Sequence, residues 1–381
     1  MGKWAGKYVI GLTGNIGTGK SVVRRMLEHL GAFGIDADAL SHRAIAKGAP
    51  GYAKIVEVFG RWVLAPDGEV DRAKLGRVVF SDPAALAQLE AIVHPLVRQA
   101  VDWMVQRSSK PVVVVEAIKL LESPLREHMD SIWVVASLEE TQLSRLMQKR
   151  GLPEAEARQR INAQPRQEQK IAAANVVIRN VSTFEDTWKQ VAAAWQKTVP
   201  SLEGPAVKAS AGAAKPQAQS PIALSVMRGR PRDAESIAGL LNRLKKTNLT
   251  SEDIMAEFGE KAFLLLRSGD RLVGSAGWQV ENLVARIGEI VIEPEVSKAQ
   301  ALPLVISEME RASRDLQCEA ALIFTTSDLT DDKVWQGLGY ERRTPQSLGV
   351  SVWQEAARET LKPGMALYFK QLRQDRVLRP I

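Results

Sequence analysis

Short apolar runs alternate with longer helical patterns through the first half of the chain. The apolar runs lie at residues 8–12, 33–35, 112–115, 132–135 and 176–178. They are continuous rather than alternating, which is typical of strands that are buried on both faces. Helical patterns lie between them, for example at residues 84–106, 139–150 and 184–197. This alternation predicts an α/β fold in which helices cover both faces of a parallel sheet.

The order of elements differs after residue 222. A strand near residues 222–227 and a helix near 233–246 are followed by strands at 262–267 and 272–279. The residues between these two strands, Ser268-Gly269-Asp270-Arg271, predict a hairpin turn. Further strands are expected at 285–292, at 320–325 and late in the chain, with helices at 301–316 and 331–338. The pattern predicts a second, α+β domain with a largely antiparallel start.

Residues 198–222, between the two halves, are rich in Pro, Ala, Ser and Gly and show no apolar periodicity. Such a stretch cannot bury enough apolar surface to offset the entropy that is lost on ordering. We therefore expect a flexible linker at residues 199–222, between a first domain of residues 1–198 and a second of residues 223–381.

The chain has 381 residues, of which 45% are hydrophobic and 25% charged, a balance that suits two globular domains. No apolar run reaches the roughly 18 residues of a membrane-spanning helix, so no membrane span is expected. The short, glycine-interrupted apolar run at the start does not predict a cleaved secretory signal. The single cysteine, Cys318, excludes intramolecular disulfides and multi-cysteine metal sites, and it fits a reducing, cytoplasmic setting.

The net charge of +7 bears on the kind of partner. An excess of positive charge is typical of proteins that bind nucleic acid, and equally of proteins that bind a polyanionic small substrate such as a nucleotide. No basic run or aromatic-basic repeat occurs in the sequence. We therefore expect a small-molecule substrate and no nucleic acid.

A glycine-rich motif directly follows the first predicted strand. It reads Gly14-Asn15-Ile16-Gly17-Thr18-Gly19-Lys20-Ser21 and leads into a helical pattern that begins at Val22. This matches the phosphate-binding loop G-x-x-x-x-G-K-[ST] in the strand–loop–helix context that it requires. Glycines let backbone N–H groups turn toward phosphate oxygens, and the N-terminus of the helix faces the same anion. We expect residues 14–22 to bind ATP, with Lys20 at the β and γ phosphates and Ser21 as a ligand of Mg²⁺.

This motif does not separate a kinase from a GTPase or a motor, but two aspartates favour a kinase. Asp36 and Asp38 follow the second predicted strand, and ligands gather at the carboxyl ends of parallel strands. A phosphotransferase needs a group that accepts a proton from the attacking hydroxyl or orients it. From the spacing alone, a helix cap by Asp38 is an equally good interpretation.

With these residues the first half of the chain resembles the dephospho-coenzyme A kinase family. The resemblance starts from Gly11-Leu12-Thr13-Gly14 with the loop and from Ile35-Asp36-Ala37-Asp38. Further blocks stand in family order over nearly all of residues 7–197, at residues 47–52, 59–60, 67–76, 79–80, 82–83, 94–95, 142–146, 149–150 and 176–180, with Gln164 and Lys170. The combination is far more specific than the phosphate-binding loop alone.

The resemblance implies a P-loop nucleotide-kinase fold with helical acceptor and lid regions, near residues 50–106 and 145–164. It implies ATP-dependent phosphorylation of the ribose 3′-hydroxyl of dephospho-coenzyme A, with ATP and Mg²⁺ as cofactors. The second acid of the family's Asp-Ala-Asp block is the proposed base, which matches Asp38. The resemblance also implies that Arg145 stabilises the transferring phosphoryl group, and that Arg150 and Asn180 contact ATP.

Some residues depart from the family or allow two interpretations. After the third strand the family often has an aspartate and then a proline with two leucines, where this chain has Val115-Glu116-Ala117-Ile118-Lys119-Leu120-Leu121. Glu116 is expected to replace that aspartate in orienting Mg²⁺. Each of four arginines suits a phosphate contact or a solvated helix face, and the phosphate contact is favoured more for Arg145 and Arg150 than for Arg160 and Arg166. His94 is interpreted as a packing or helix-capping residue, although it could approach the acceptor nucleotide.

Residues 223–381 resemble a GNAT-type N-acetyltransferase domain, less specifically. The resemblance rests on the strand–helix opening, on residues 272–276 and 289–294, and on the block Trp335-Gln336-Gly337-Leu338-Gly339-Tyr340. Such enzymes hold the coenzyme pyrophosphate with a glycine-containing turn that opens a helix. The corresponding residues 296–303 contain no glycine, and Pro303 fits the first turn of the expected helix.

Glu289 is a candidate base and Tyr340 a candidate acid for acetyl transfer, but both have simple structural interpretations. We therefore expect a non-catalytic or regulatory second domain that binds CoA or acyl-CoA. One alternative is an active acetyltransferase fused to the kinase. For the first half, the alternative is another P-loop kinase that acts on a nucleoside or nucleotide.

Overall fold

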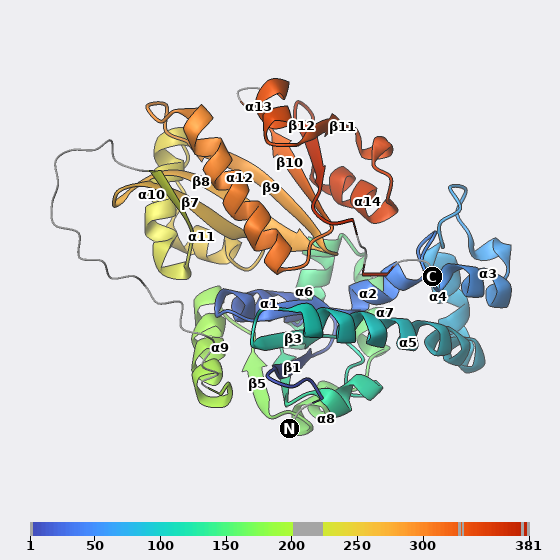
Figure 1. The fold of residues 1–381 in the computed structure, drawn as a ribbon. Coiled ribbons are helices and arrows are strands. Elements are labelled where there is room, and N and C mark those ends of the chain that lie inside the picture. The colour runs from blue at the N-terminus through green and yellow to red at the C-terminus, as the bar shows by residue number, and fades with distance from the viewer. Residues whose placement is uncertain (1–2, 201–223, 327–328, 330, 375–376, 379–381) are drawn as a thin grey trace. The chain divides into compact units, whose positions relative to one another are not determined.

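The computed structural model describes residues 3–200, 224–326, 329, 331–374 and 377–378, with the side chains of Phe80 and Arg150 left out (Figure 1). The chain divides into two compact units. One comprises residues 1–194, 345–356 and 373–381, and the other comprises residues 195–344 and 357–372. Most of the expected linker, from residue 201 onward, lies outside the described residues, so the linker and the domain boundaries stay predictions.

The first unit contains a five-stranded sheet in the order β2-β3-β1-β4-β5. All four pairings are parallel, as the apolar runs predicted. Every residue of β3 and β4 is buried, because helices cover both faces of these strands. The strands are β1 (Tyr8–Thr13), β2 (Phe33–Asp36), β3 (Val112–Glu116), β4 (Ser131–Ala136) and β5 (Val176–Arg179).

Helices connect these strands and form the segments in which the acceptor and lid regions are expected. Helix α1 packs against β1, β2 and β3, while α2 packs against the long helix α5. The helices are α1 (Lys20–His29), α2 (Ala37–Ala44), α3 (Tyr52–Phe59), α4 (Arg72–Ser81), α5 (Pro83–Arg107), α6 (Glu139–Arg150), α7 (Glu154–Asn162), α8 (Gln167–Ala172) and α9 (Phe184–Thr198). Short 3₁₀ turns lie at Arg61–Val63 and Pro124–His128.

The second unit contains a seven-stranded sheet in the order β11-β12-β10-β9-β8-β7-β6. Only the β9–β10 pair is parallel within this sheet. The expected hairpin is confirmed, because β7 ends at Ser268 and β8 begins at Arg271. The strands are β6 (Leu224–Arg228), β7 (Ala262–Ser268), β8 (Arg271–Glu281), β9 (Val284–Ile292), β10 (Ala320–Thr325), β11 (Glu341–Arg343) and β12 (Ala366–Gln371).

Helix α12 (Lys298–Asp315) crosses strands β6 to β9 and closes the core of this unit (Figure 1). The core includes Trp278, Met309 and Trp335, and Cys318 is buried in it. The other helices of the second half are α10 (Ala234–Lys245), α11 (Ser251–Glu257), α13 (Asp332–Gly337) and α14 (Ser351–Thr360). Within the described residues, no helix is long and apolar enough to cross a membrane.

Candidate active site

The phosphate-binding loop joins β1 to α1 and closes on itself through polar contacts. Gly19 immediately precedes α1 with φ 90°, a left-handed conformation that glycine adopts without strain. A Cβ atom at Gly19 would also overlap the side-chain amide of Asn180. The Thr18 hydroxyl donates to the Asn15 carbonyl at 2.8 Å, and Lys20 Nζ donates to the same carbonyl at 3.3 Å. Lys20 is only 7% exposed, so the loop already surrounds the ammonium group that would meet phosphate.

The end of the predicted lid contacts this loop. The Ile16 N–H donates to Gln164 Oε1 at 2.7 Å, and Asn15 Nδ2 donates to the Pro165 carbonyl at 2.9 Å. The loop conformation therefore depends on residues that lie about 150 positions later in the chain. Gln164, which the sequence analysis named only as part of a family block, thus belongs to the candidate site.

Arg145 and Asn180 hold the outer side of the loop. Arg145 Nη1 donates to the carbonyls of Gly17 and Thr18, both at 3.2 Å, and its Nη2 donates to the carbonyl and the side chain of Asn180. Asn180 Nδ2 donates to the Thr18 carbonyl at 2.9 Å. The two residues expected at the phosphoryl group and at ATP therefore contact the loop backbone directly.

Ser21, at the end of the loop, contacts the buried pair of Glu116 and Arg24. Ser21 Oγ donates to Glu116 Oε1 at 2.9 Å, and Arg24 Nε donates to Glu116 Oε2 at 2.8 Å. Glu116 is 4% exposed, and it pairs in register with Asp36 of the neighbouring strand. Hydroxyl and carboxylate oxygens side by side are the hard ligands that Mg²⁺ takes. The two expected metal ligands therefore lie together.

Asp36 and Asp38 have separate functions in the structure. The Asp36 carboxylate caps α2 by accepting the Ala39 N–H at 2.9 Å. The expected alternative of a cap by Asp38 is therefore wrong, because β2 runs one residue further than its apolar run and α2 begins at Ala37. Burial, followed by the charge of Glu116, raises the pKa of Asp36 to about 6.

Asp38 lies in the first turn of α2 and faces the loop that follows β3. Its Oδ2 accepts the Ile118 N–H at 3.0 Å. Burial raises the pKa of Asp38, although the Ile118 N–H and the charges of Lys20 and Lys170 oppose that shift. Asp38 and Lys20 thus lie in one electrostatic environment, as a kinase site requires.

Lys170 is a site residue that the sequence analysis quoted in a family block but did not place in the site. It lies on α8, is 2% exposed, and donates from Nζ to the Ile118 carbonyl at 2.7 Å. The only sequence signal is an isolated cation before the small apolar run Ile171-Ala172-Ala173-Ala174. Such a signal does not separate a buried lysine from a solvated one.

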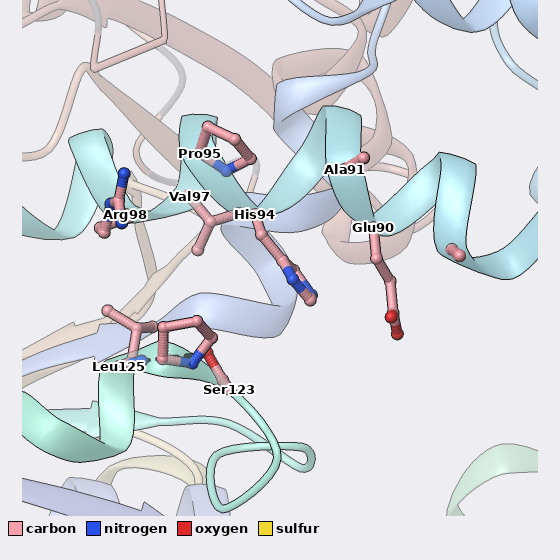
Figure 2. A pocket seen from close by; sticks show the side chains of 10 residues that line it. Glu90, Ala91, His94, Pro95, Val97, Arg98, Ser123 and Leu125 are labelled. Atoms are coloured by element: carbon pink, nitrogen blue, oxygen red, sulfur yellow. Dashed lines mark hydrogen bonds between the residues drawn. The ribbon is translucent and has the colours of Figure 1, made fainter.

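A cavity of about 410 Å³ lies between α5 and the segment that follows β3 (Figure 2). Glu90, His94 and Arg98 line it from α5, and Ser123, Pro124 and Leu125 line it from the other side. In Figure 2 the side chains of Glu90 and His94 extend from α5 into the space below the helix. The packing or capping interpretation of His94 is wrong, because His94 is exposed and lies in the middle of α5.

The remaining arginines of the lid differ from one another. Arg160 forms an ion pair with Glu156 on the same helix, as expected of a solvated helix face. Arg166 is exposed directly before α8. The side chain of Arg150 is outside the described part of the chain, so its contact with ATP stays a prediction.

The candidate acetyl-transfer residues of the second unit are poorly disposed for catalysis. Lys261 hydrogen-bonds the Glu289 carboxylate, and although burial opposes the shift, Lys261 and Lys245 lower the pKa of Glu289. Tyr340 is fully buried in the core, and burial beside Glu310 raises its pKa. Pro303 is not in the first turn of its helix, because α12 begins three residues earlier than expected, at Lys298.

Comparison with known proteins covers the first half of the chain well. The family model described as dephospho-CoA kinase matches residues 8–186. The dephospho-CoA kinase of Geobacter metallireducens is 44% identical over 194 residues, which are 50% of this chain and 96% of that protein. The dephospho-CoA kinase of Thermobifida fusca is 43% identical over 189 residues, which are 49% of this chain and 94% of that protein.

The second half has a weaker likeness among solved structures. An acetyltransferase of the GNAT family from Streptococcus pneumoniae aligns with 39% of this chain and 99% of its own, at 15% identity and a TM-score of 0.31. A likeness at that level shows no activity or ligand for the second unit. The GNAT-type resemblance therefore stays an expectation from sequence.

Proposed function

The chain belongs to the dephospho-CoA kinase family and phosphorylates dephospho-CoA with ATP, and we propose that Asp38 is the base of this reaction. The alignments cover 96% and 94% of the dephospho-CoA kinases of Geobacter metallireducens and Thermobifida fusca, which disfavours the alternative of a nucleoside or nucleotide kinase. One observation carries the assignment of Asp38: its carboxylate faces the loop after β3 in the electrostatic environment of Lys20, whereas Asp36 caps α2.

In this proposal Asp38 accepts the proton of the ribose 3′-hydroxyl while that oxygen attacks the γ-phosphorus. The bond from this phosphorus to the β–γ bridging oxygen breaks, and ADP leaves. Burial raises the pKa of Asp38, which brings its basicity closer to neutral pH and so suits proton transfer at that pH. The Lys20 ammonium and the backbone amides of the loop stabilise the charge on the phosphate oxygens.

Arg145 contributes chiefly through the loop. Its guanidinium holds the carbonyls of Gly17 and Thr18, which fixes the turn that must present amides to the phosphates. Because these contacts already engage both terminal nitrogens, a direct contact with the γ-phosphate requires some of them to exchange. The catalytic role of Arg145 remains part of the proposal.

Ser21 and Glu116 would hold Mg²⁺ together with the phosphates of ATP. Within the described residues, no group of three or more His, Cys, Asp or Glu side chains could hold a metal ion by itself. This fits Mg²⁺, which keeps several waters and uses few protein ligands beside substrate phosphates. When bound, the ion would neutralise charge on the β and γ phosphates.

We assign the acceptor to the cavity beneath α5. The segment that presents Ile118 to Asp38 continues to Ser123, which lines this cavity, so a molecule bound there extends toward the base. Arg98 and His94 offer a cation and an imidazole to the pyrophosphate of dephospho-CoA. Lys119, on the same segment, is paired with Glu90 at 2.9 Å.

For the second unit, we propose binding of CoA or acyl-CoA without acyl transfer. The ion-paired state of Glu289 and the burial of Tyr340 support the absence of transfer. The CoA made by the first unit is the ligand that such a unit would sense. A cytoplasmic location, suggested by the single cysteine, likewise stays a prediction.

The Asp38→Asn variant tests the proposed base. We expect kcat for dephospho-CoA phosphorylation to fall by about 10²- to 10⁴-fold, because asparagine cannot accept the proton. ATP affinity, measured by calorimetry, should stay within about threefold, since Asp38 lies outside the loop. Asp36→Asn is the matched control and should keep most of the activity. A large loss of ATP binding in Asp38→Asn would contradict the role of Asp38 as base.

A further inference from the structure

Lys170 is buried, charged and not used by the mechanism above. The residue is 2% exposed, and burial lowers its pKa. Its Nζ donates a hydrogen bond of 2.7 Å to a main-chain carbonyl. Burying an ammonium group costs free energy unless it is hydrogen-bonded and compensated by charge. A lysine retained in such a position is therefore a candidate for a specific task.

The carbonyl that Lys170 contacts belongs to Ile118, and the peptide groups of Ile118 join three parts of the site. The Ile118 carbonyl accepts Lys170 Nζ and also the Thr13 hydroxyl, the latter at 3.0 Å. The Ile118 N–H donates to Asp38 Oδ2 at 3.0 Å. One residue thus connects the base to the end of β1 and to α8.

Ile118 is not fixed by a regular element. It lies two residues after β3 ends at Glu116, so no sheet ladder holds its peptide groups. Two donors on its carbonyl restrict the rotation of this stretch, and the adjacent N–H is thereby aimed at Asp38. The ammonium group also lies in the electrostatic environment of Asp38, together with Lys20, Glu116 and Glu122.

From this geometry, and given the proposed role of Asp38, we infer that Lys170 is a positioning residue that holds the Asp38 carboxylate in place through the Ile118 backbone. It does not act as a proton donor or as a phosphate ligand. Its contribution is to the orientation of the base, so it belongs to the turnover step and not to ATP binding.

A double-mutant cycle between Lys170→Met and Asp38→Asn in the full chain tests this inference. Single-turnover phosphorylation of dephospho-CoA with radiolabelled ATP detects the slow variants. We expect Lys170→Met alone to lower the rate by about 10- to 100-fold, with the KM for ATP within about threefold. In the Asp38→Asn background the same substitution should change the rate by less than about threefold, because there is no base left to position.

Three outcomes of this cycle would overturn the inference. The first is an equal loss of rate in both backgrounds, which would mean that Lys170 acts independently of Asp38. The second is a parallel loss of ATP affinity, which would place Lys170 at the nucleotide. The third is a Lys170→Met variant that keeps the wild-type rate while Asp38→Asn is inactive, which would support the proposed base alone and refute the positioning role.

Two further variants keep the test decisive if Lys170→Met is unstable. Lys189→Met, at an exposed ion pair with Glu185, is the matched control and should leave the rate unchanged. Thr13→Val removes the second donor to the same carbonyl with little change of shape. We expect Thr13→Val to lower the rate less than Lys170→Met does, and to have no effect in the Asp38→Asn background. A loss of rate that persists in that background would overturn the inference.

Discussion

Asp36 and Asp38 show how two identical side chains, two positions apart, take on different tasks. Asp36 is the last residue of β2 and the cap of α2, so its carboxylate is used by the backbone. Asp38, the second residue of α2, faces the loop after β3. Which of the two aspartates caps the helix depends on the residue at which β2 ends and α2 begins. The sequence could not fix that point, because the apolar run ends one residue before the strand does.

The raised pKa of Asp36 makes the stability of the chain depend on pH. Its folded pKa is about 6, against about 3.9 for an aspartate in an unfolded chain. Between these values the folded state binds more protons, so the contribution of Asp36 to stability falls as the pH rises from about 4 to about 6.

We therefore expect Asp36→Asn to raise the free energy of unfolding at pH 7.5 by on the order of 2 kcal/mol, with little effect at pH 4. Asparagine keeps the cap on α2. Denaturant unfolding at the two pH values measures the difference. Asp36→Ala, which lacks the cap, should be about 1 kcal/mol less stable than Asp36→Asn at both values. The same effect of Asp36→Asn at pH 4 and pH 7.5 would contradict the expectation.

Among elements, the buried parallel strands were predicted best. All five apolar runs became strands of one parallel sheet, because continuous hydrophobic residues in short runs suit strands covered on both sides. Helix ends were predicted less well: α12 begins at Lys298, so Pro303 lies within it. Helix α14 was not predicted at all, although Trp353, Ala356 and Ala357 in its sequence, SVWQEAARET, recur at helical spacing.

The lining of the α5 cavity could not be read from the sequence either. His94 and Arg98 are four residues apart and so lie on one face of the helix, but that face meets the Ser123 segment only through tertiary packing. Periodicity shows which residues share a face, and it does not show what lies opposite.

Arg98→Ala tests the placement of the acceptor in this cavity. We expect the KM for dephospho-CoA to rise by about tenfold, because one charge-assisted contact to the pyrophosphate is lost. The KM for ATP should remain unchanged, since the phosphate-binding loop is not touched. Steady-state kinetics with each substrate varied in turn provides the measurement. Arg158→Ala, at an exposed ion pair on α7, is the control. Equal changes in both KM values would argue against this acceptor site.

At the scale of the whole molecule, composition and element order were enough to indicate two units of different topology. The first sheet is entirely parallel and the second is mixed, as the two patterns of apolar runs predicted. What the second unit does could not be predicted, because its resemblance rested on short blocks and its expected pyrophosphate turn has no glycine.

The intact chain is expected to release no thiol from acetyl-CoA, with or without candidate amines. Ion pairing with lysines lowers the pKa of Glu289, although burial opposes that shift, and so makes it a weak base, while Tyr340 is enclosed in the core, so neither candidate suits proton transfer. A thiol-trapping dye records the release, and calorimetric titration with acetyl-CoA separately reports binding. Amine-dependent release of thiol would establish the bifunctional alternative. Binding without release would support a sensing role.

The hydrogen bond between main-chain atoms and the proposed base, Asp38, has an evolutionary consequence. Every amino acid has a carbonyl, so the hydrogen bonds from Lys170 and Thr13 to residue 118 do not depend on the identity of its side chain. Only proline would remove the amide that reaches Asp38. Selection would then act visibly on the donors and leave little trace at the residue between them. The backbone contacts of residue 118 can in this way be inherited even where the amino acid at that position differs between relatives.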